Sequence, residues 1–130
     1  IIYHNKLERT PIFSPSVGNF IQGMIVSIPL HFSWFNYKVD TEKIQSLMEE
    51  FYSGANFIKV LKKDEGISDK GYFRPDNLVG TNCLDISVFG NDDNDQLIIC
   101  SRLDNLGKGA SGAAIQSMNI ALGYNETLGL

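Results

Sequence analysis

Apolar residues at every second position predict a long strand in the first third of the chain. From residue 24 to residue 32 these positions hold Met24, Val26, Ile28, Leu30 and Phe32. A period of two is typical of a strand with one buried face. Pro29 lies within this segment and lacks an N–H donor, so we expect the strand at a sheet edge or at a bulge. A shorter strand is expected at residues 10–13, ended by Pro15.

Three more strands are predicted further along the chain. Residues 57–61 form a short apolar run, and the polar residues 62–77, with their glycines and proline, are expected to form a surface loop. Residues 84–89 alternate as a strand does, and a turn follows at residues 90–95. Residues 96–102 then return as the antiparallel partner. They are apolar on both faces, which predicts a central strand.

Two helices complete the pattern. The first can be capped by Asp40 or Thr41 and ended by Gly54, and its apolar stripe is Ile44, Leu47, Met48 and Phe51. The second begins near Gly109 and ends at Gly123. It has an apolar side and small residues that allow close approach: Ile115, Met118 and Leu122, and Ala110, Ala113 and Ala114. The order of elements predicts an α+β fold, a mostly antiparallel mixed sheet with helices packed on one face.

Composition limits the classes of protein that fit. A chain of 130 residues has the length of one domain, which we place at residues 1–130. The net charge of −4 argues against a nucleic-acid surface. We expect a soluble chain with no membrane partner, since no apolar run reaches the roughly 20 residues of a membrane helix and no signal peptide is recognisable. Cys83 and Cys100 lie in apolar segments and are expected to be buried and reduced, as in a cytoplasmic protein.

Residues 103–116 are rich in glycine and alanine and lie where a strand leads into a helix. Backbone N–H groups at such a helix entrance could bind a phosphate or an amide, or the glycines could only let the helix pack tightly on the sheet. The segment is not a P-loop, because no Gly-Lys-Ser/Thr follows at the required spacing. It also lacks the three-glycine dinucleotide fingerprint.

The order of residues in this segment resembles the C-terminal signature of N-acetyl-gamma-glutamyl-phosphate reductase. The shared features are Asp-Asn-Leu, Lys-Gly-Ala and Ala-Ile-Gln within residues 104–116, followed by Asn119 and Gly123. Four other stretches agree with the family in the same order: residues 13–15 with 18–20 and Gly23, residues 79–82 with 85–86, residues 97–99 with 104–106, and residues 123–130. The resemblance covers nearly the whole chain, from about Pro11 to Leu130.

The resemblance implies a fold, a reaction and a cofactor. The fold would be that of a glyceraldehyde-3-phosphate dehydrogenase-like C-terminal domain. The reaction would be the NADP-dependent reductive dephosphorylation of N-acetylglutamyl phosphate, a small acyl phosphate, in arginine biosynthesis, by a homo-oligomer. Members of this family have an N-terminal nucleotide-binding domain, a nucleophilic cysteine and a catalytic histidine that have no counterpart in this chain. We therefore expect a C-terminal fragment that has no catalytic residue of its own and no activity alone.

The resemblance also implies a cofactor site at Asn105, Gly109 and Ala110. In related dehydrogenases the asparagine of this turn faces the nicotinamide carboxamide, whose donor and acceptor match an amide side chain. The glycine and alanine would let the cofactor approach closely. The alternative is that Asn105 caps the turn or helix by bonding a backbone N–H.

Several positions depart from the family pattern. Ser16 replaces a histidine, Gln22 replaces an arginine and Ala113 replaces a glutamine, so phosphate binding by this part is in doubt. Other chemistry is not favoured. Cys83 and Cys100 lack an activating neighbour, and His4 and His31 are expected to be exposed. Asp92, Asp93 and Asp95 lack the spacing of a calcium loop and are assigned to a solvated hairpin tip, with no metal.

Two other functions remain open. A related semialdehyde dehydrogenase, acting on aspartyl phosphate or an aminoadipyl analogue, would have a similar C-terminal domain. A non-catalytic dimerisation or binding module is the alternative from another class.

Overall fold

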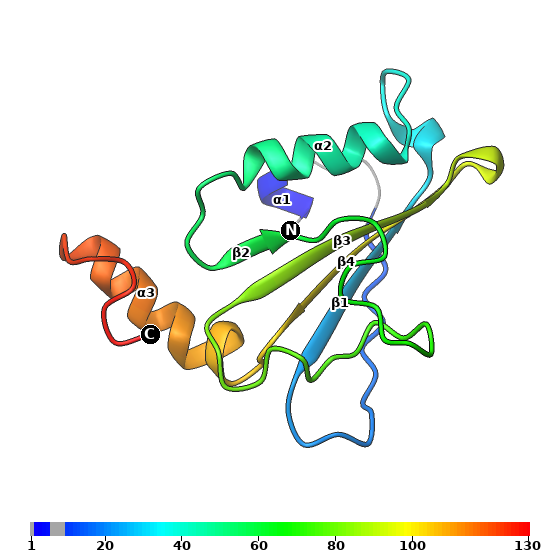
Figure 1. The fold of residues 1–130 in the computed structure, drawn as a ribbon. Coiled ribbons are helices and arrows are strands. Elements are labelled where there is room, and N and C mark those ends of the chain that lie inside the picture. The colour runs from blue at the N-terminus through cyan, green and yellow to red at the C-terminus, as the bar shows by residue number, and fades with distance from the viewer. Residues whose placement is uncertain (1, 6–9) are drawn as a thin grey trace.

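A mixed four-stranded sheet forms the centre of the protein in the computed structural model, which describes residues 2–5 and 10–130 (Figure 1). The strands lie in the order β1-β4-β3-β2. β4 pairs antiparallel with β1 and with β3, whereas β2 pairs parallel with β3. The strand bounds are Met24–Leu30 for β1, Ile58–Val60 for β2, Leu84–Asn91 for β3 and Gln96–Leu103 for β4. The α+β class and the central place of the fourth strand are confirmed.

The predicted first long strand is β1, and it lies at an edge of the sheet as Pro29 indicated. Its expected buried face is wrong for most of its length, because Met24, Val26 and Ile28 are 36 to 50% exposed. The reason is the position of helix α2 (Thr41–Phe51), which contacts β2 and β3, so that of the β1 residues only Leu30 reaches the core.

The short strand expected at residues 10–13 is also wrong. These residues belong to no helix or strand and pair with no strand in the described part of the chain, and Ile12 and Phe13 are 95% and 89% exposed. Pro11 and Pro15 lack N–H donors, which weakens any ladder here.

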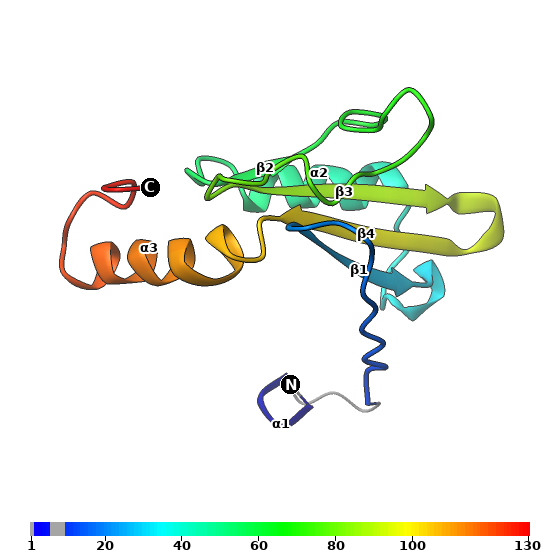
Figure 2. The same cartoon turned by 90° about the horizontal axis from the view of Figure 1, so that it is seen from below.

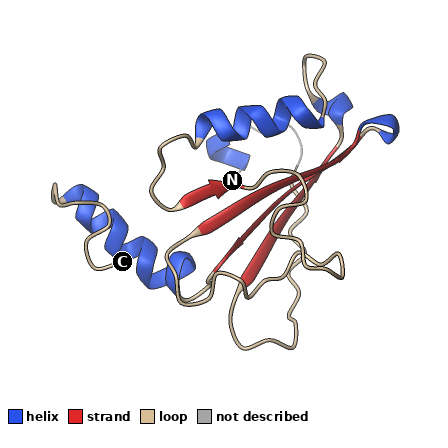
Figure 3. Ribbon diagram, in the orientation of Figure 1, coloured by secondary structure: helices blue, strands red, loops and turns tan. Residues whose placement is uncertain are grey.

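Helix α2, Thr41–Phe51, covers one face of the sheet (Figures 1 and 3). Asp40 is its N-cap, since the carboxylate accepts the Lys43 N–H at 2.8 Å. Ile44 packs with Val39 and Leu97 in the core. Leu47 borders this core as predicted, but Phe51 is 79% exposed and contacts the Tyr52 ring instead.

Helix α3, Gly112–Ala121, continues beyond the end of the sheet (Figure 2). A π-helical turn, Gly107–Ser111, joins it to β4. Its buried positions are Gly112 and Asn119, while Met118 and Leu122 are more than half exposed (51% and 63%). Ile115, the third residue of the predicted apolar side, is half-buried, so the described part of the chain covers that side only in part.

A close approach to α3 occurs at Gly112; of the alanines that the sequence suggested, Ala110 and Ala114 are exposed and Ala113 is half-buried. A Cβ on Gly112 would lie 2.2 Å from Oδ1 of Asn82, which comes just before β3. The helix ends as predicted, with Gly123 at φ +73° and the Tyr124 N–H bonded to the Asn119 carbonyl at 2.8 Å.

The remaining elements are short. Helix α1 spans Ile2–Asn5, and 3-10 turns occupy Phe32–Trp34 and Asp92–Asn94. The second turn forms the tip of the β3–β4 hairpin, where Asp92 accepts the Thr41 N–H at 2.8 Å and so ties the hairpin to α2. None of the helices in residues 2–5 and 10–130 has the length and apolar character needed to cross a membrane.

Candidate functional site

Asp104 is the first residue after β4 and one of the most buried side chains described, with 1% of its surface exposed. Its carboxylate accepts hydrogen bonds from the Gln22 amide at 2.7 Å, from the Gly80 N–H at 2.8 Å and from the Leu106 N–H at 2.9 Å. These donors lower the pKa of the Asp104 carboxyl to about 2, the Gln22 amide most of all. Asp104 thus joins the segment before β1, the loop before β3 and its own turn.

Asn105 is held by the residue next to Gln22. Its Oδ1 accepts the Gly23 N–H at 2.8 Å, and this contact fixes which end of the amide is the oxygen. Gly23 has φ +112°, and a Cβ there would lie 2.4 Å from the Pro75 carbonyl oxygen. Only glycine fits between Asn105 and Pro75.

The amide nitrogen of Asn105 has no acceptor among the residues that the structure describes. Asn105 is half-buried, and Gly109 and Ala110 in the following turn are exposed. The three residues named by the sequence therefore lie on one turn, where the Asn105 amide nitrogen has no described acceptor and Gly109 and Ala110 are exposed. The alternative was that Asn105 caps the turn or helix by bonding a backbone N–H. Asn105 does accept a backbone N–H, but that of Gly23, which is 82 residues away in the sequence.

The entrance to α3 is not a phosphate cradle of the kind that its glycines suggested. The Leu106 N–H points to the Asp104 carboxylate, and the Gly109 N–H donates to the Asp104 carbonyl at 2.8 Å. The Ser111 N–H donates to the Leu106 carbonyl at 3.1 Å. Three backbone donors of this turn therefore already have acceptors, and one of these acceptors is the Asp104 carboxylate, an anion from the chain itself.

The Lys108 side chain contacts other residues of the chain. Its ammonium donates to Oε1 of Gln116 and lies 5.6 Å from the centre of the Phe57 ring. Nε2 of Gln116 donates to Glu126 at 2.6 Å, and Asn56 donates to the other oxygen of Glu126 at 2.5 Å. This chain of contacts ties α3 and the C-terminal segment to the residues just before β2, with the Lys108 ammonium as one of its donors.

Gln22 gives a reason for one departure from the family pattern. Its amide donates to both oxygens of Asp104, so this position serves the turn and does not face an anionic ligand. The motif around Asn105 includes Asp104, so the sequence drew attention to this residue. Its partners Gln22 and Gly80, however, lie 82 and 24 residues away in the sequence. Periodicity does not reveal such contacts.

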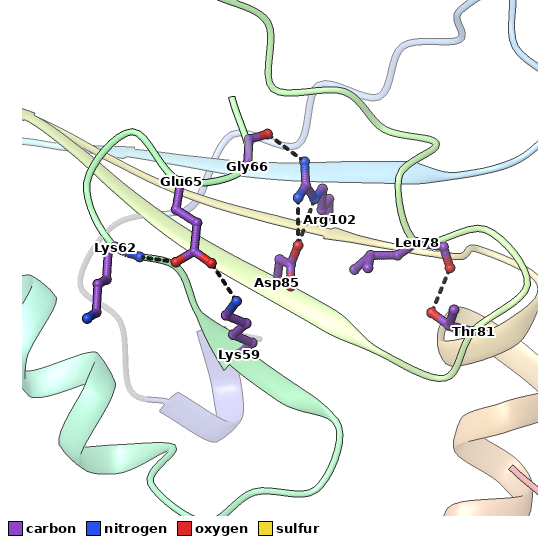
Figure 4. Close-up of polar contacts among 8 residues, drawn as sticks. All are labelled: Lys59, Lys62, Glu65, Gly66, Leu78, Thr81, Asp85 and Arg102. Carbon is purple, nitrogen blue, oxygen red and sulfur yellow. Dashed lines mark hydrogen bonds and ion pairs between the residues drawn. The ribbon is translucent and has the colours of Figure 1, made fainter. Parts of the chain in front are cut away.

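A second buried polar cluster lies on the central strands (Figure 4). Nε and Nη2 of Arg102 contact Oδ2 of Asp85 at 2.9 and 2.7 Å, and Nη1 donates to the Gly66 carbonyl at 2.9 Å. The guanidinium carbon lies 4.6 Å from the centre of the Phe73 ring. Arg102 thereby attaches the loop of residues 62–77 to the face of the sheet opposite α2. A cavity of about 400 Å³ beside it is lined by Lys59, Glu65 and Cys83 as well.

The other polar candidates have structural partners. Cys100 is buried and Cys83 half-buried, and both thiols are free. His31 is exposed as predicted, and its Nδ1 contacts the Asp95 carbonyl at 2.9 Å, while His4 is exposed near the N-terminus. Asp95 also accepts two hydrogen bonds from Ser33, so the hairpin tip is more than a solvated turn. Within the described ranges no group of three or more His, Cys, Asp or Glu side chains is placed to hold a metal.

Comparison with known proteins identifies the domain. Residues 2–105 match the family model described as semialdehyde dehydrogenase, dimerisation domain. The chain is 43% identical over 129 residues to N-acetyl-gamma-glutamyl-phosphate reductase 2 of Nostoc sp.. The aligned residues make up 98% of this chain and 40% of that protein. The chain is also 42% identical over 120 residues to N-acetyl-gamma-glutamyl-phosphate reductase of Brucella ovis, covering 92% of this chain and 38% of the relative. The chain thus spans about 40% of the length of these curated relatives. It belongs to the semialdehyde dehydrogenase dimerisation domain family.

Proposed function

We propose that this chain is the C-terminal part of an NADP-dependent reductase that converts N-acetylglutamyl phosphate to N-acetylglutamate semialdehyde and phosphate. The relatives that support this carry the name of that reductase and match nearly the whole chain. The observation that carries the role of the chain is the turn at Asn105, where an amide nitrogen without an acceptor among the described residues is followed by exposed small residues.

The donor set of this turn suits the nicotinamide end of the cofactor. With Oδ1 of Asn105 bonded to Gly23, its Nδ2 is left to donate to the carboxamide oxygen of a nicotinamide. Exposed Gly109 and Ala110 add no bulk on that side. The Lys108 ammonium donates to Gln116 and the Leu106 N–H donates to the Asp104 carboxylate, so we propose that the cofactor phosphates are held elsewhere in the protein. When bound, NADPH supplies the hydride, and the chain's own residues orient its ring.

The chemical step itself needs groups from outside this chain. Cys100 is buried in β4 and contacts Ser27, and Cys83 precedes Leu84, which pairs with Leu103 next to the Asn105 turn; neither thiol has a histidine hydrogen-bonded to it among the described residues. We therefore propose that the chain alone does not turn over substrate, and that it contributes the sheet, a surface for homo-oligomer formation and the nicotinamide wall. The family description as a dimerisation domain supports the second of these contributions.

One rival function has a specific observation in its favour. The family model is described by semialdehyde dehydrogenase chemistry in general, and a domain with the same fold could serve an enzyme acting on aspartyl phosphate. The names of the relatives favour the N-acetylglutamyl substrate.

Substitutions at Asn105 in the intact reductase test the proposed cofactor contact. Asn105→Asp keeps the oxygen that accepts the Gly23 N–H but loses the donor nitrogen, whereas Asn105→Ala loses both. We expect each to raise the KM for NADPH about fivefold, the effect of one lost hydrogen bond. Asn125→Ala is the matched control, because Asn125 also accepts a backbone N–H, that of Thr127, at 2.9 Å. An unchanged KM in Asn105→Asp would return Asn105 to a purely structural role.

A further inference from the structure

Gln22 and Gly23, which are adjacent in the sequence, bind Asp104 and Asn105, which are also adjacent and lie at the start of the turn. Gln22 contacts Asp104 through its amide, and the Gly23 N–H contacts Asn105 through Oδ1. The four residues come from segments about 80 positions apart, one leading into β1 and one following β4. A double link of this kind restrains both the backbone of the turn and the side-chain rotamer of Asn105.

The surroundings of the Asp104 carboxylate indicate that it fixes the geometry of the turn. It is almost fully buried, and all its hydrogen-bond donors within the described chain are neutral: one side-chain amide and backbone N–H groups. Burying a charge costs free energy unless several donors surround it, so this arrangement depends on every donor being in place. The donors lie on three separate segments, and the carboxylate can be satisfied only when those segments meet.

The neighbouring glycines make the same turn intolerant of shifts. A Cβ on Gly107 would lie 2.8 Å from the Thr81 carbonyl oxygen and 3.2 Å from Oδ2 of Asp104. The loop before β3 therefore touches the turn both through the Gly80 N–H and through the Thr81 carbonyl. The backbone on either side of Asn105, at Asp104 and Gly107, therefore cannot shift towards this loop without breaking or crowding one of these contacts.

We propose that Asp104 and Gln22 are positioning residues that hold the Asn105 side chain in the orientation needed to face the nicotinamide. This inference rests on the proposed function, because it assigns to these residues an effect exerted through Asn105. Neither side chain is placed to touch the cofactor itself, since Asp104 is buried and Gln22 is directed at Asp104.

A double-mutant cycle in the intact reductase separates positioning from general stability. The single variants are Asp104→Asn, Gln22→Ala and Asn105→Ala, and each of the first two is also combined with Asn105→Ala. Gln22→Ala removes only one group of donors and keeps the test valid if Asp104→Asn does not fold. Asp92→Asn is the control, because Asp92 likewise accepts a backbone N–H at 2.8 Å, but at the hairpin tip. KM for NADPH, kcat and the unfolding temperature are measured for each variant.

We expect Gln22→Ala and Asp104→Asn each to raise the KM for NADPH about fivefold in the wild-type background. In the Asn105→Ala background the same substitutions should change KM less than twofold, because the residue through which they act is gone. Asp92→Asn should leave KM unchanged.

Other results would contradict either the positioning role of Gln22 and Asp104 or the cofactor contact of Asn105. If Asn105→Ala raises KM and the Gln22 or Asp104 effects add to it in full, the positioning role is wrong and the proposed cofactor contact stands. If Gln22→Ala leaves KM unchanged while Asn105→Ala raises it, the same conclusion follows. If Asn105→Ala itself has no effect on KM, the cofactor contact is wrong and positioning through it is overturned as well.

Discussion

Removing the carboxylate of Asp85 should destabilise this domain strongly, because it leaves the Arg102 guanidinium buried without its counter-charge. Arg102 and Asp85 are 4% and 6% exposed, and the two nitrogen–oxygen contacts between them measure 2.9 and 2.7 Å. Breaking a buried pair by removing one partner costs about 3–5 kcal/mol. In Asp85→Ala the guanidinium keeps its bond to the Gly66 carbonyl and its contact with Phe73, so we expect the lower end, ~3 kcal/mol.

That loss is large for a protein of this size. Domains have free energies of unfolding of about 5–15 kcal/mol, so ~3 kcal/mol removes a fifth to more than half of the stability. At about 4 °C per kcal/mol, the unfolding temperature should fall by about 12 °C. Urea denaturation followed by circular dichroism gives the free energy directly, and a thermal scan gives the midpoint.

Two further variants show whether the reasoning is right. In Asp85→Ala with Arg102→Leu, both charges are gone, and much of the lost stability should return, since an apolar replacement of a buried pair is often neutral. Lys59→Ala breaks the exposed Lys59–Glu65 pair on the neighbouring strand and should have little effect. A loss below about 1 kcal/mol in Asp85→Ala, or a double variant as unstable as the single one, would refute the argument from burial.

Two other predictions concern the turn and the helix after it. The pKa of Asp104 is lowered from its ordinary 3.8 to about 2, so the stability contributed by the ionised carboxylate is full above about pH 4 and is lost as the pH falls towards 2. The difference in unfolding free energy between wild type and Asp104→Asn should therefore shrink over that range, and a difference independent of pH would contradict it. Gly112→Ala places a Cβ 2.2 Å from Oδ1 of Asn82 and should lower the unfolding temperature, whereas Ser117→Ala, at an exposed position of the same helix, should not. Equal midpoints for these two variants would show that α3 can shift to make room.

Periodicity was sufficient for most elements because it reflects local geometry. The alternation in residues 24–30, the apolar character of β4 on both faces and the Asp40 cap of α2 each depend on residues within a few positions of one another. The positions of Gly54 and Gly123 after the two helices are local signals of the same kind, and both have positive φ.

Burial was harder to predict than secondary structure. An apolar face is buried only if another element covers it, and α2 covers β2 and β3 but little of β1. The same holds for α3, whose apolar residues Met118 and Leu122 extend past the sheet. For the segment at residues 10–13, the sequence suggested a strand, but no strand partner exists in the described part of the chain.

The candidate site also combines features that the sequence predicted with contacts that it did not. The order of residues around Asn105 resembled a reductase signature, and the comparisons confirmed the family. The assignment of Asn105, Gly109 and Ala110 to a cofactor remains a prediction, although the three are placed together on an accessible turn. The sequence did not reveal that Asp104 and Gln22 are partners. Asp104 was noted only as part of the Asp-Asn-Leu motif, and Gln22 only as a replacement for a positively charged arginine.

By itself, the sequence determined the family, the order of strands and helices along the chain, the caps and the turn that contains Asn105. Those features follow from spacings of a few residues and from motifs that can be read along the chain. Only the tertiary structure decided that Gln22 meets Asp104, that Gly23 meets Asn105 and that Arg102 meets Asp85. These contacts join segments 17 to 82 residues apart, and they depend on strand register and loop paths, which no local pattern encodes.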